Sequence, residues 1–193
     1  MSLRIINDNY ENETFKELDA SEEQFKGVAF YNCHFEKSSF QFAELKGCSF
    51  ENCTFVNCNL ALAKFNNTKF IGVVFKDSKL LGINWSSTGV VIITSFRNCL
   101  LDSSVFSDMN LAKIKLVSCS MVETSFMNTK LARVKFDDCD LKNCQFHQND
   151  LSYADFSTSR NYFINSSSNK LHKTIFSLPE AVSLLANLDI TLK

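Results

Sequence analysis

Large apolar residues recur at every fifth position over most of the chain. Neither regular element has this period, because five residues carry a helix well past one full turn and an odd step along a strand changes its face. The chain must therefore turn a corner at every repeat. The first series comprises Phe25, Phe30, Phe35, Phe40, Leu45, Phe50, Phe55, Leu60, Phe65, Phe70, Phe75, Leu80 and Trp85. The second comprises Phe96, Leu101, Phe106, Leu111, Leu116, Met121, Phe126, Leu131, Phe136, Leu141, Phe146, Leu151 and Phe156.

A longer period of twenty residues gives the number of sides. Within the second series the same residue type returns at every fourth centre, as Phe at one side and as Leu at the next. Twenty residues then make one coil with four sides, and residues of like type stack on one another. The residues expected to stack in the core are Phe106, Phe126 and Phe146 on one side and Leu111, Leu131 and Leu151 on another.

Small side chains precede the large centres by two positions. All eight cysteines fall at this position, and a cramped inward-facing site selects small, weakly polar side chains. Disulfide partners or metal ligands would have no reason to keep this phase, so the sequence predicts free buried thiols, with no metal and no cofactor. The small residues are Val28, Cys33, Ser38, Ala43, Cys48, Cys53, Cys58, Ala63, Cys99, Ser104, Cys119, Cys139, Cys144 and Ala154.

The two series are out of phase by one residue. Trp85 and Phe96 are eleven residues apart, so with Val91 as the intervening centre one extra residue lies within 86–90. The sequence predicts one continuous solenoid with a bulge at this point. The interruption is a candidate partner-binding surface. The alternative is that the extra residue is accommodated without a functional role and that Val91, Ile92 and Ile93 pack. The candidate residues are Ser86, Ser87, Thr88, Gly89 and Val90.

The stretches CDLKNCQFHQNDLSYADF (139–156) and CSFENCTFVNCNLALAKF (48–65) resemble the pentapeptide-repeat family. The resemblance covers residues 25–156, although Asp or Asn stands before the centre at only six repeats. It implies an all-β fold, a right-handed quadrilateral β-helix whose coils stack at about 4.8 Å, so that about seven coils form a rod roughly 30 Å long or more. We expect residues 1–24 to form an acidic N-terminal segment or cap and residues 157–193 to form a C-terminal cap and dimerisation module.

The C-terminal sequence SLPEAVSLLANLDITLK predicts a short capping helix. Ser177 and Glu180 have the spacing of a capping box, and Pro179 suits the first helical turn. This region resembles the C-terminal module of the Qnr-type quinolone-resistance proteins and the microcin B17 immunity protein, which implies a homodimer joined end to end. The apolar residues expected at the dimer interface are Leu178, Val182, Leu185 and Leu188.

Charge is unevenly distributed. The chain has a net charge of -1, but its first 23 residues carry seven acidic groups against Arg4 and Lys16, and the remainder is net positive. The residues Lys113, Lys115, Arg133 and Lys135 form a basic cluster on successive coils. Two interpretations of this cluster are possible: a solvated face that keeps the rod soluble, or a site for an acidic partner. We expect no direct nucleic-acid binding.

Catalytic motifs are missing from the sequence. The histidines His34, His147 and His172 lie far apart in the repeat, and neither a phosphate-binding loop nor metal-ligand spacing occurs, so an enzyme is not expected. The N-terminus lacks the apolar core of a secretion signal, and no apolar run could span a bilayer, which predicts a cytoplasmic location. The resemblance implies a binding protein that protects a type II topoisomerase, DNA gyrase or topoisomerase IV, from quinolone-like or microcin-like poisons by imitating DNA. The alternative is a scaffold with an unrelated partner.

Overall fold

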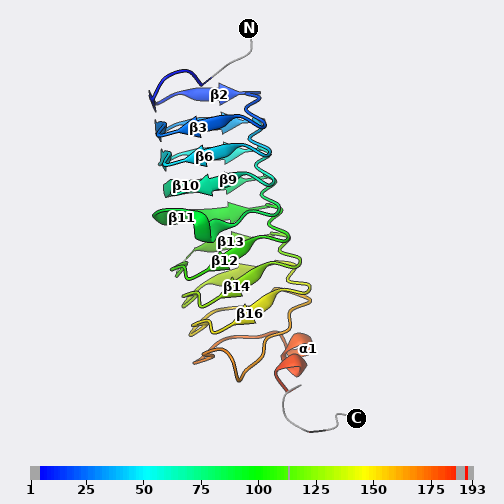
Figure 1. The fold of residues 1–193 in the computed structure, drawn as a ribbon. Helices are drawn as coiled ribbons and strands as arrows, with labels where there is room; N and C mark the ends of the chain where they lie inside the picture. Colours follow the sequence, from blue (N-terminus) through cyan, green and yellow to red (C-terminus); the bar gives the residue numbers. More distant parts are fainter. Residues whose placement is uncertain (1–4, 113, 186–189, 191–193) are drawn as a thin grey trace.

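The chain folds into a rod of stacked parallel coils, with the N-terminus at one end and a short helix at the other (Figure 1). The computed structural model describes residues 5–112, 114–185 and 190. Each coil has four faces, which we number in chain order, and equivalent residues on neighbouring coils are twenty apart, as in the pairing of Tyr10 with Phe30. The fold is the parallel β-helix that the fivefold repeat predicts.

Three of the four faces carry short strands. The first face contains β1 (Asn9–Glu11), β4 (Ala29–Tyr31), β7 (Ser49–Glu51) and the starts of β10 (Lys69–Lys76) and β11 (Val91–Arg97). The second contains β2 (Thr14–Lys16), β5 (His34–Glu36), β8 (Thr54–Val56), the ends of β10 and β11, β13 (Lys115–Val117) and β15 (Lys135–Asp137). The fourth contains β3 (Gln24–Lys26), β6 (Glu44–Lys46), β9 (Lys64–Asn66), β12 (Val105–Ser107), β14 (Ser125–Met127) and β16 (Gln145–His147).

The third face is a ladder of single bridges that runs from Asp19 to Arg160. Most of the described corners turn through a residue with positive φ two positions after the centre, such as Asn12 (φ 57) and Asn32 (φ 51). This left-handed conformation is one that Asn adopts more readily than most residues. The corner amide donates to a carbonyl on the next coil, as Asn12 N does to Tyr31 O at 3.0 Å.

The stack of paired coils extends further at both ends than the sequence predicts. β1 and β2 pair in register with β4 and β5, so the first coil begins at residue 9 and not at residue 25. At the other end, bridges join Asp150 to Lys170 and Asp155 to Ile175, beyond the expected end at residue 156. The acidic N-terminal segment is thus largely a regular coil.

The short helices lie at the insertion and at the C-terminus. The 3₁₀ helix η1 (Trp85–Ser87) lies at the insertion, where the ladder spacing changes. Phe65 stacks with Trp85, twenty residues on, whereas Phe70 pairs with Val91, twenty-one residues on. One extra residue is therefore taken up between Trp85 and Val91. At the C-terminus, α1 (Leu178–Ala181) is followed by η2 (Val182–Leu185).

Candidate binding surfaces

Side chains fill the interior of the described coils. Phe126 lies between Phe106 and Phe146, with ring centroids 5.2 Å apart on both sides and nearly parallel planes. The residues Phe106, Phe126, Phe146, Leu111, Leu131 and Leu151 are all buried, each no more than 5% exposed. A ligand or partner must therefore use the outer surface or the ends of the rod.

The eight cysteines are free and buried at the inward small position. Five of the thiols donate to carbonyls of the preceding coil, as Cys58 Sγ does to Phe35 O at 3.4 Å. Burial raises the pKa of Cys53 to about 12 and that of Cys144 to about 12. The hydrogen bond with Cys119 and burial together raise the pKa of Cys99. The hydrogen bonds with Cys139 and Cys99 instead lower the pKa of Cys119. The thiols whose pKa is raised stay protonated near neutral pH, so they are poor nucleophiles and poor metal ligands.

Metal-binding and acid–base groups are also dispersed. In the parts of the chain that the structure describes, no three His, Cys, Asp or Glu side chains are grouped so that they could hold a metal ion. His34 lies on the second face and His147 on the fourth, while His172 lies against Tyr153 with ring centroids 5.2 Å apart. None of the helices among the described residues is long and apolar enough to cross a bilayer.

The insertion lies at the corner between the fourth and first faces, and we call residues 86–90 the insertion corner. Asn84 Oδ1 caps η1 by accepting from Ser86 N at 3.1 Å, and Thr88 Oγ1 donates to Trp85 O at 2.5 Å. Ser86 Oγ accepts from Ser107 N on the next coil at 2.7 Å. Gly89 N donates to Thr68 O on the preceding coil at 2.9 Å. The corner is thus an ordered part of the rod.

Two apolar side chains project from the insertion and its neighbouring strand. Val90 is 50% exposed and Ile92 is 60% exposed, whereas Val91 between them packs against the core. The packing interpretation is therefore confirmed for Val91 and wrong for Ile92, and the side chain of Ile93 lies outside what the structure describes. The repeat itself carries the missed signal, because Val91 occupies an inward centre and the residue after a centre faces outward.

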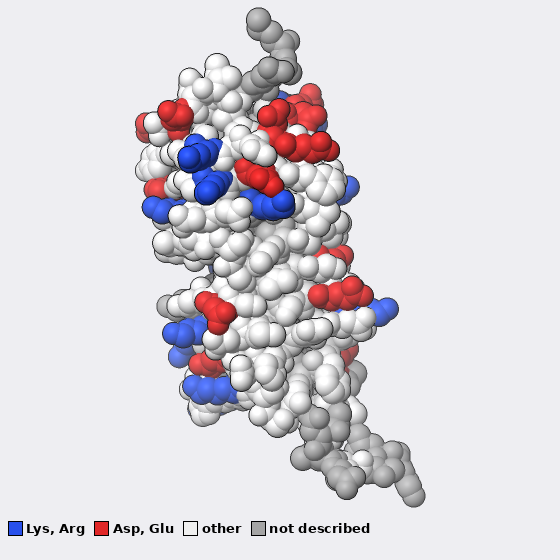
Figure 2. Space-filling model, viewed as in Figure 1, with Lys and Arg blue, Asp and Glu red and all other residues white. Residues whose placement is uncertain are grey.

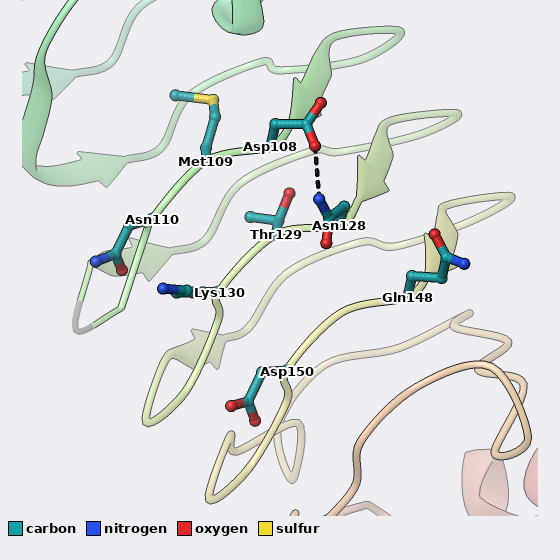
Figure 3. A pocket seen from close by; sticks show the side chains of 8 residues that line it. All are labelled: Asp108, Met109, Asn110, Asn128, Thr129, Lys130, Gln148 and Asp150. Atoms are coloured by element: carbon teal, nitrogen blue, oxygen red, sulfur yellow. Dashed lines mark hydrogen bonds between the residues drawn. The ribbon is translucent and has the colours of Figure 1, made fainter.

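A groove follows the same corner along the rod. A cavity of about 370 Å³ is lined by Asp108, Met109, Asn110, Asn128, Thr129, Lys130, Gln148 and Asp150 (Figure 3). A second cavity of about 320 Å³ shares Asp108, Met109 and Asn110 with the first and reaches Ser86, Thr88 and Gly89 of the insertion corner. We call the two together the corner groove.

The corner groove is lined mainly by side chains that can form hydrogen bonds. Asn128 Nδ2 donates to Asp108 Oδ1 at 2.6 Å, and Asn110, Lys130 and Asp150 occupy equivalent positions on successive coils (Figure 3). Hydrogen bonds from Ser152, together with Lys170, lower the pKa of Asp150 below its ordinary value. These groups can recognise a polar ligand or a protein loop. They do not bring together a nucleophile and a base, which acyl or phosphoryl transfer would use.

The C-terminal end exposes apolar side chains. Leu178 is 87% exposed and Val182 is 51% exposed, beside the similarly exposed Phe163 and Ile175 of the last coil. Leu185 is half-buried, and Leu188 lies outside the described residues. Three of the four residues expected at a dimer interface are thus placed at this end.

The predicted capping box at Ser177 is wrong in its contacts. The Ser177 hydroxyl bonds to Glu180 Oε2 at 2.6 Å and not to a backbone N–H of the helix, and this bond lowers the pKa of Glu180. The Ser177 amide instead donates to the hydroxyl of Tyr162 at 3.0 Å. Tyr162 is buried in the last coil, so it fixes the start of α1 on the end of the rod.

The charged groups lie on different coils. Asp and Glu side chains gather over the N-terminal coils (Figure 2), where all seven acidic residues from Asp8 to Glu23 are exposed. Of the basic cluster, Lys115 pairs in register with Lys135, and Arg133 lies at the corner before Lys135. Lys113 lies outside the described residues.

Together these features define a solid four-sided β-solenoid with a polar groove and exposed apolar side chains on its outer surface. The chain belongs to the pentapeptide-repeat family: pentapeptide repeats (9 copies) match residues 24–74, and the pentapeptide repeat region matches residues 91–161. No curated protein matches the chain by sequence.

Solved structures match the fold over nearly the whole chain. A trypsin-treated form of QnrB1, a plasmid-mediated fluoroquinolone resistance protein, is similar at 19% identity and a TM-score of 0.62, with 100% of both chains covered. HetL, a pentapeptide-repeat protein involved in heterocyst differentiation regulation from the cyanobacterium Nostoc, is similar at 15% identity and a TM-score of 0.62, with 89% of both chains covered. At these identities the likeness defines the fold.

Proposed function

We propose that this chain is a non-enzymatic, cytoplasmic binding protein that protects a type II topoisomerase, DNA gyrase or topoisomerase IV, from quinolone-like or microcin-like poisons. The observation that carries the proposal is the likeness to QnrB1 over the full length of both chains. The likeness covers the terminal regions as well as the repeats. Two proteins that had only the repeat in common would not have to be similar in their terminal regions.

The insertion corner and the corner groove supply the contact surface in this proposal. Val90 and Ile92 add exposed apolar area beside the hydrogen-bonding groups of the groove. Apolar anchors surrounded by polar groups are the usual composition of a protein interface. Both features lie on one corner, so one partner surface can contact them together.

The acidic first coil is the part of the rod that resembles DNA in charge. Its seven exposed carboxylates lie at one end, and the rest of the chain is net positive. We propose that any imitation of DNA involves this coil alone, with complementary charge speeding encounter with a basic surface.

A homodimer is part of the same proposal. Leu178 and Val182 expose apolar surface at the end of the rod, where a second copy would bury the same patch on both chains. Two rods joined at these ends would place their insertion corners far apart on one elongated particle.

A scaffold with an unrelated partner is the alternative function. HetL matches with the same TM-score as QnrB1, and its described role is in differentiation. The fold alone therefore supports both functions, and the choice depends on the partner.

Growth in a fluoroquinolone, and separately in microcin B17, tests the proposal. Cells that express the chain should grow at drug concentrations that stop cells with an empty vector. The matched control is the same chain with Phe126→Ala, which weakens the core without touching the surface. Equal sensitivity of all three strains, with the parent chain soluble and abundant, would support the scaffold function.

A further inference from the structure

The corner between the first and second faces changes its composition along the rod. In the N-terminal coils its left-handed position holds Asn12, Asn32, Asn52 and Gly72, which suit a positive φ. In the C-terminal coils the same position holds Arg133 (φ 64), Tyr153 (φ 60) and Lys173 (φ 53). Long side chains also occupy the left-handed position at another corner, at Glu22, Phe42 and Leu62. The role of this corner must therefore be read from the contacts of its side chains.

Arg133 and Lys173, on the coils before and after, both contact the ring of Tyr153. Arg133 Cζ lies 4.8 Å from the centroid of the Tyr153 ring, and Lys173 Nζ lies 5.9 Å from it. His172 packs against the same ring at a steep angle. Tyr153 therefore holds two cations in place by cation–π contacts. We call Arg133, Tyr153, His172 and Lys173 the basic corner.

The cations of the basic corner are held differently from those around them. On the flanking faces Lys135 pairs with Asp137 at 3.1 Å and Lys170 pairs with Asp150 at 3.4 Å. Among the described residues, Arg133 and Lys173 form no ion pair, and neither do Lys115 and Lys130 nearby. What distinguishes Arg133 and Lys173 is that the Tyr153 ring holds both of them in place.

We propose that the basic corner binds an acidic, extended segment of a partner protein. Arg133 and Lys173 lie two coils apart, which is about 10 Å along the rod at the usual strand spacing. In an extended segment of the polyproline II type, residues three apart lie on the same side and about 9 Å from each other, so carboxylates at every third residue match this distance. The surface differs from the insertion corner and the corner groove, and the proposal does not depend on topoisomerase protection.

Nucleic acid fits this surface less well. The Tyr153 ring is occupied by Arg133 and Lys173, so a base cannot use it as a stacking platform as in proteins that bind single strands. Duplex DNA is usually held by many phosphate contacts from a strongly basic surface, whereas this chain has a sequence pI of about 6.3. A single row of two cations suits one acidic segment.

Fluorescence anisotropy with a labelled peptide of repeated Glu-Ser-Ser tests the proposal, with repeated Gln-Ser-Ser as the control peptide. We expect the full chain to bind the acidic peptide and not the neutral one, with affinity falling as salt rises. The double variant Arg133→Gln/Lys173→Gln should bind it at least about tenfold more weakly. The matched control is Lys26→Gln/Lys46→Gln, which removes two exposed stacked cations from the fourth face and should bind like the parent.

Several results would overturn the proposal. Equal loss of binding in both double variants would show a non-specific charge effect, and equal affinity for the two peptides would show that carboxylates are not recognised. Tighter binding of a single-stranded or duplex oligonucleotide through Arg133 and Lys173 would assign the corner to nucleic acid. Growth of particle mass at low salt that the Arg133→Gln/Lys173→Gln variant abolishes would assign it to the acidic coil of a second copy. A circular dichroism spectrum identical to that of the parent shows that a variant is folded, so that a change in its binding is not caused by unfolding.

Discussion

Trp85 stacks on Phe106 with ring centroids 5.9 Å apart and planes within 6° of parallel, although the two residues are twenty-one apart in the chain. Phe106 and Phe126 stack in the same way at a spacing of twenty. The aromatic column thus continues across the inserted residue, which is taken up at the surface by η1 and the insertion corner. An extra residue can therefore reshape the outside of the rod and leave its core intact.

Phe126→Ala should destabilise the rod strongly. The ring is 1% exposed and stacked on both sides, and truncation of a buried Phe costs about 3 to 5 kcal/mol. In a chain of this size that corresponds to a fall in Tm of roughly 6 to 20 °C, measured by thermal unfolding.

Met127→Ala is the matched control for that change. Met127 is the next residue in β14, yet it is 45% exposed, so its truncation should shift Tm by only a few degrees. Similar shifts in both variants would mean that the fourth face is assigned to the wrong side of the strand.

The periods of five and twenty predicted the four-sided coil, and the resemblance to the pentapeptide-repeat family implied the β-helix. Each large centre is an inward side chain of one face, so the spacing of five residues is the length of one face. Phe and Leu return every twenty residues, which shows that four faces make one coil. The phase slip also places the extra residue between Trp85 and Val91, where the ladder spacing changes in the structure.

The coils at the two ends were missed because an atypical centre interrupts each of them, although Tyr10 and Phe15 keep the fivefold spacing in the first coil. Ala20 is buried at a centre of the first coil, but it is too small to stand out in the sequence. In the last coil Asn161 occupies a centre, and the adjacent Tyr162 is buried in its place. The contacts of Ser177 also depend on Tyr162, a partner fifteen residues away that local helix-start rules do not consider.

Alkaline pH should destabilise the protein through its thiols. Burial raises the pKa of Cys53 to about 12 and that of Cys58 to about 11, whereas an unfolded thiol has a pKa of about 8.5. The native state keeps these protons over that interval and unfolding releases them, so the free energy of unfolding falls as pH rises from about 8.5 towards 11. Each thiol contributes at most about 1.4 kcal/mol per pH unit.

Thermal unfolding across pH measures this effect. The Cys53→Ala variant is the control, because Ala already occupies the same inward position at Ala43 and Ala63. Its Tm should fall less steeply between pH 8.5 and 11 than that of the parent. Identical slopes would show that Cys53 is not held protonated by burial.

Val90→Asp/Ile92→Asp should abolish protection without unfolding the rod. Both side chains are at least half exposed, so the double change should leave Tm nearly unchanged while removing apolar contact with a partner. Growth in a fluoroquinolone is the measurement. Leu62→Asp, a similarly exposed apolar site on another corner, should grow like the parent. Protection that survives the double change would exclude the insertion corner from the contact surface.

Leu178→Asp/Val182→Asp should convert a homodimer into monomers. A charged group at the exposed C-terminal patch would oppose burial against a second copy. Light scattering should give the mass of two chains for the parent and of one chain for the variant. Ile6→Asp, at the opposite end and also exposed, should remain dimeric. A monomeric parent at micromolar concentration would refute this assembly.

Supercoiling by purified DNA gyrase in the presence of a fluoroquinolone tests the central claim most directly. We predict that adding the folded chain restores supercoiling in proportion to its concentration, and that Val90→Asp/Ile92→Asp fails to do so at the same concentration. The drug-free reaction gives the baseline. Unchanged inhibition by the drug at saturating parent protein, with neither gyrase nor topoisomerase IV retained on the immobilised chain, would contradict the account.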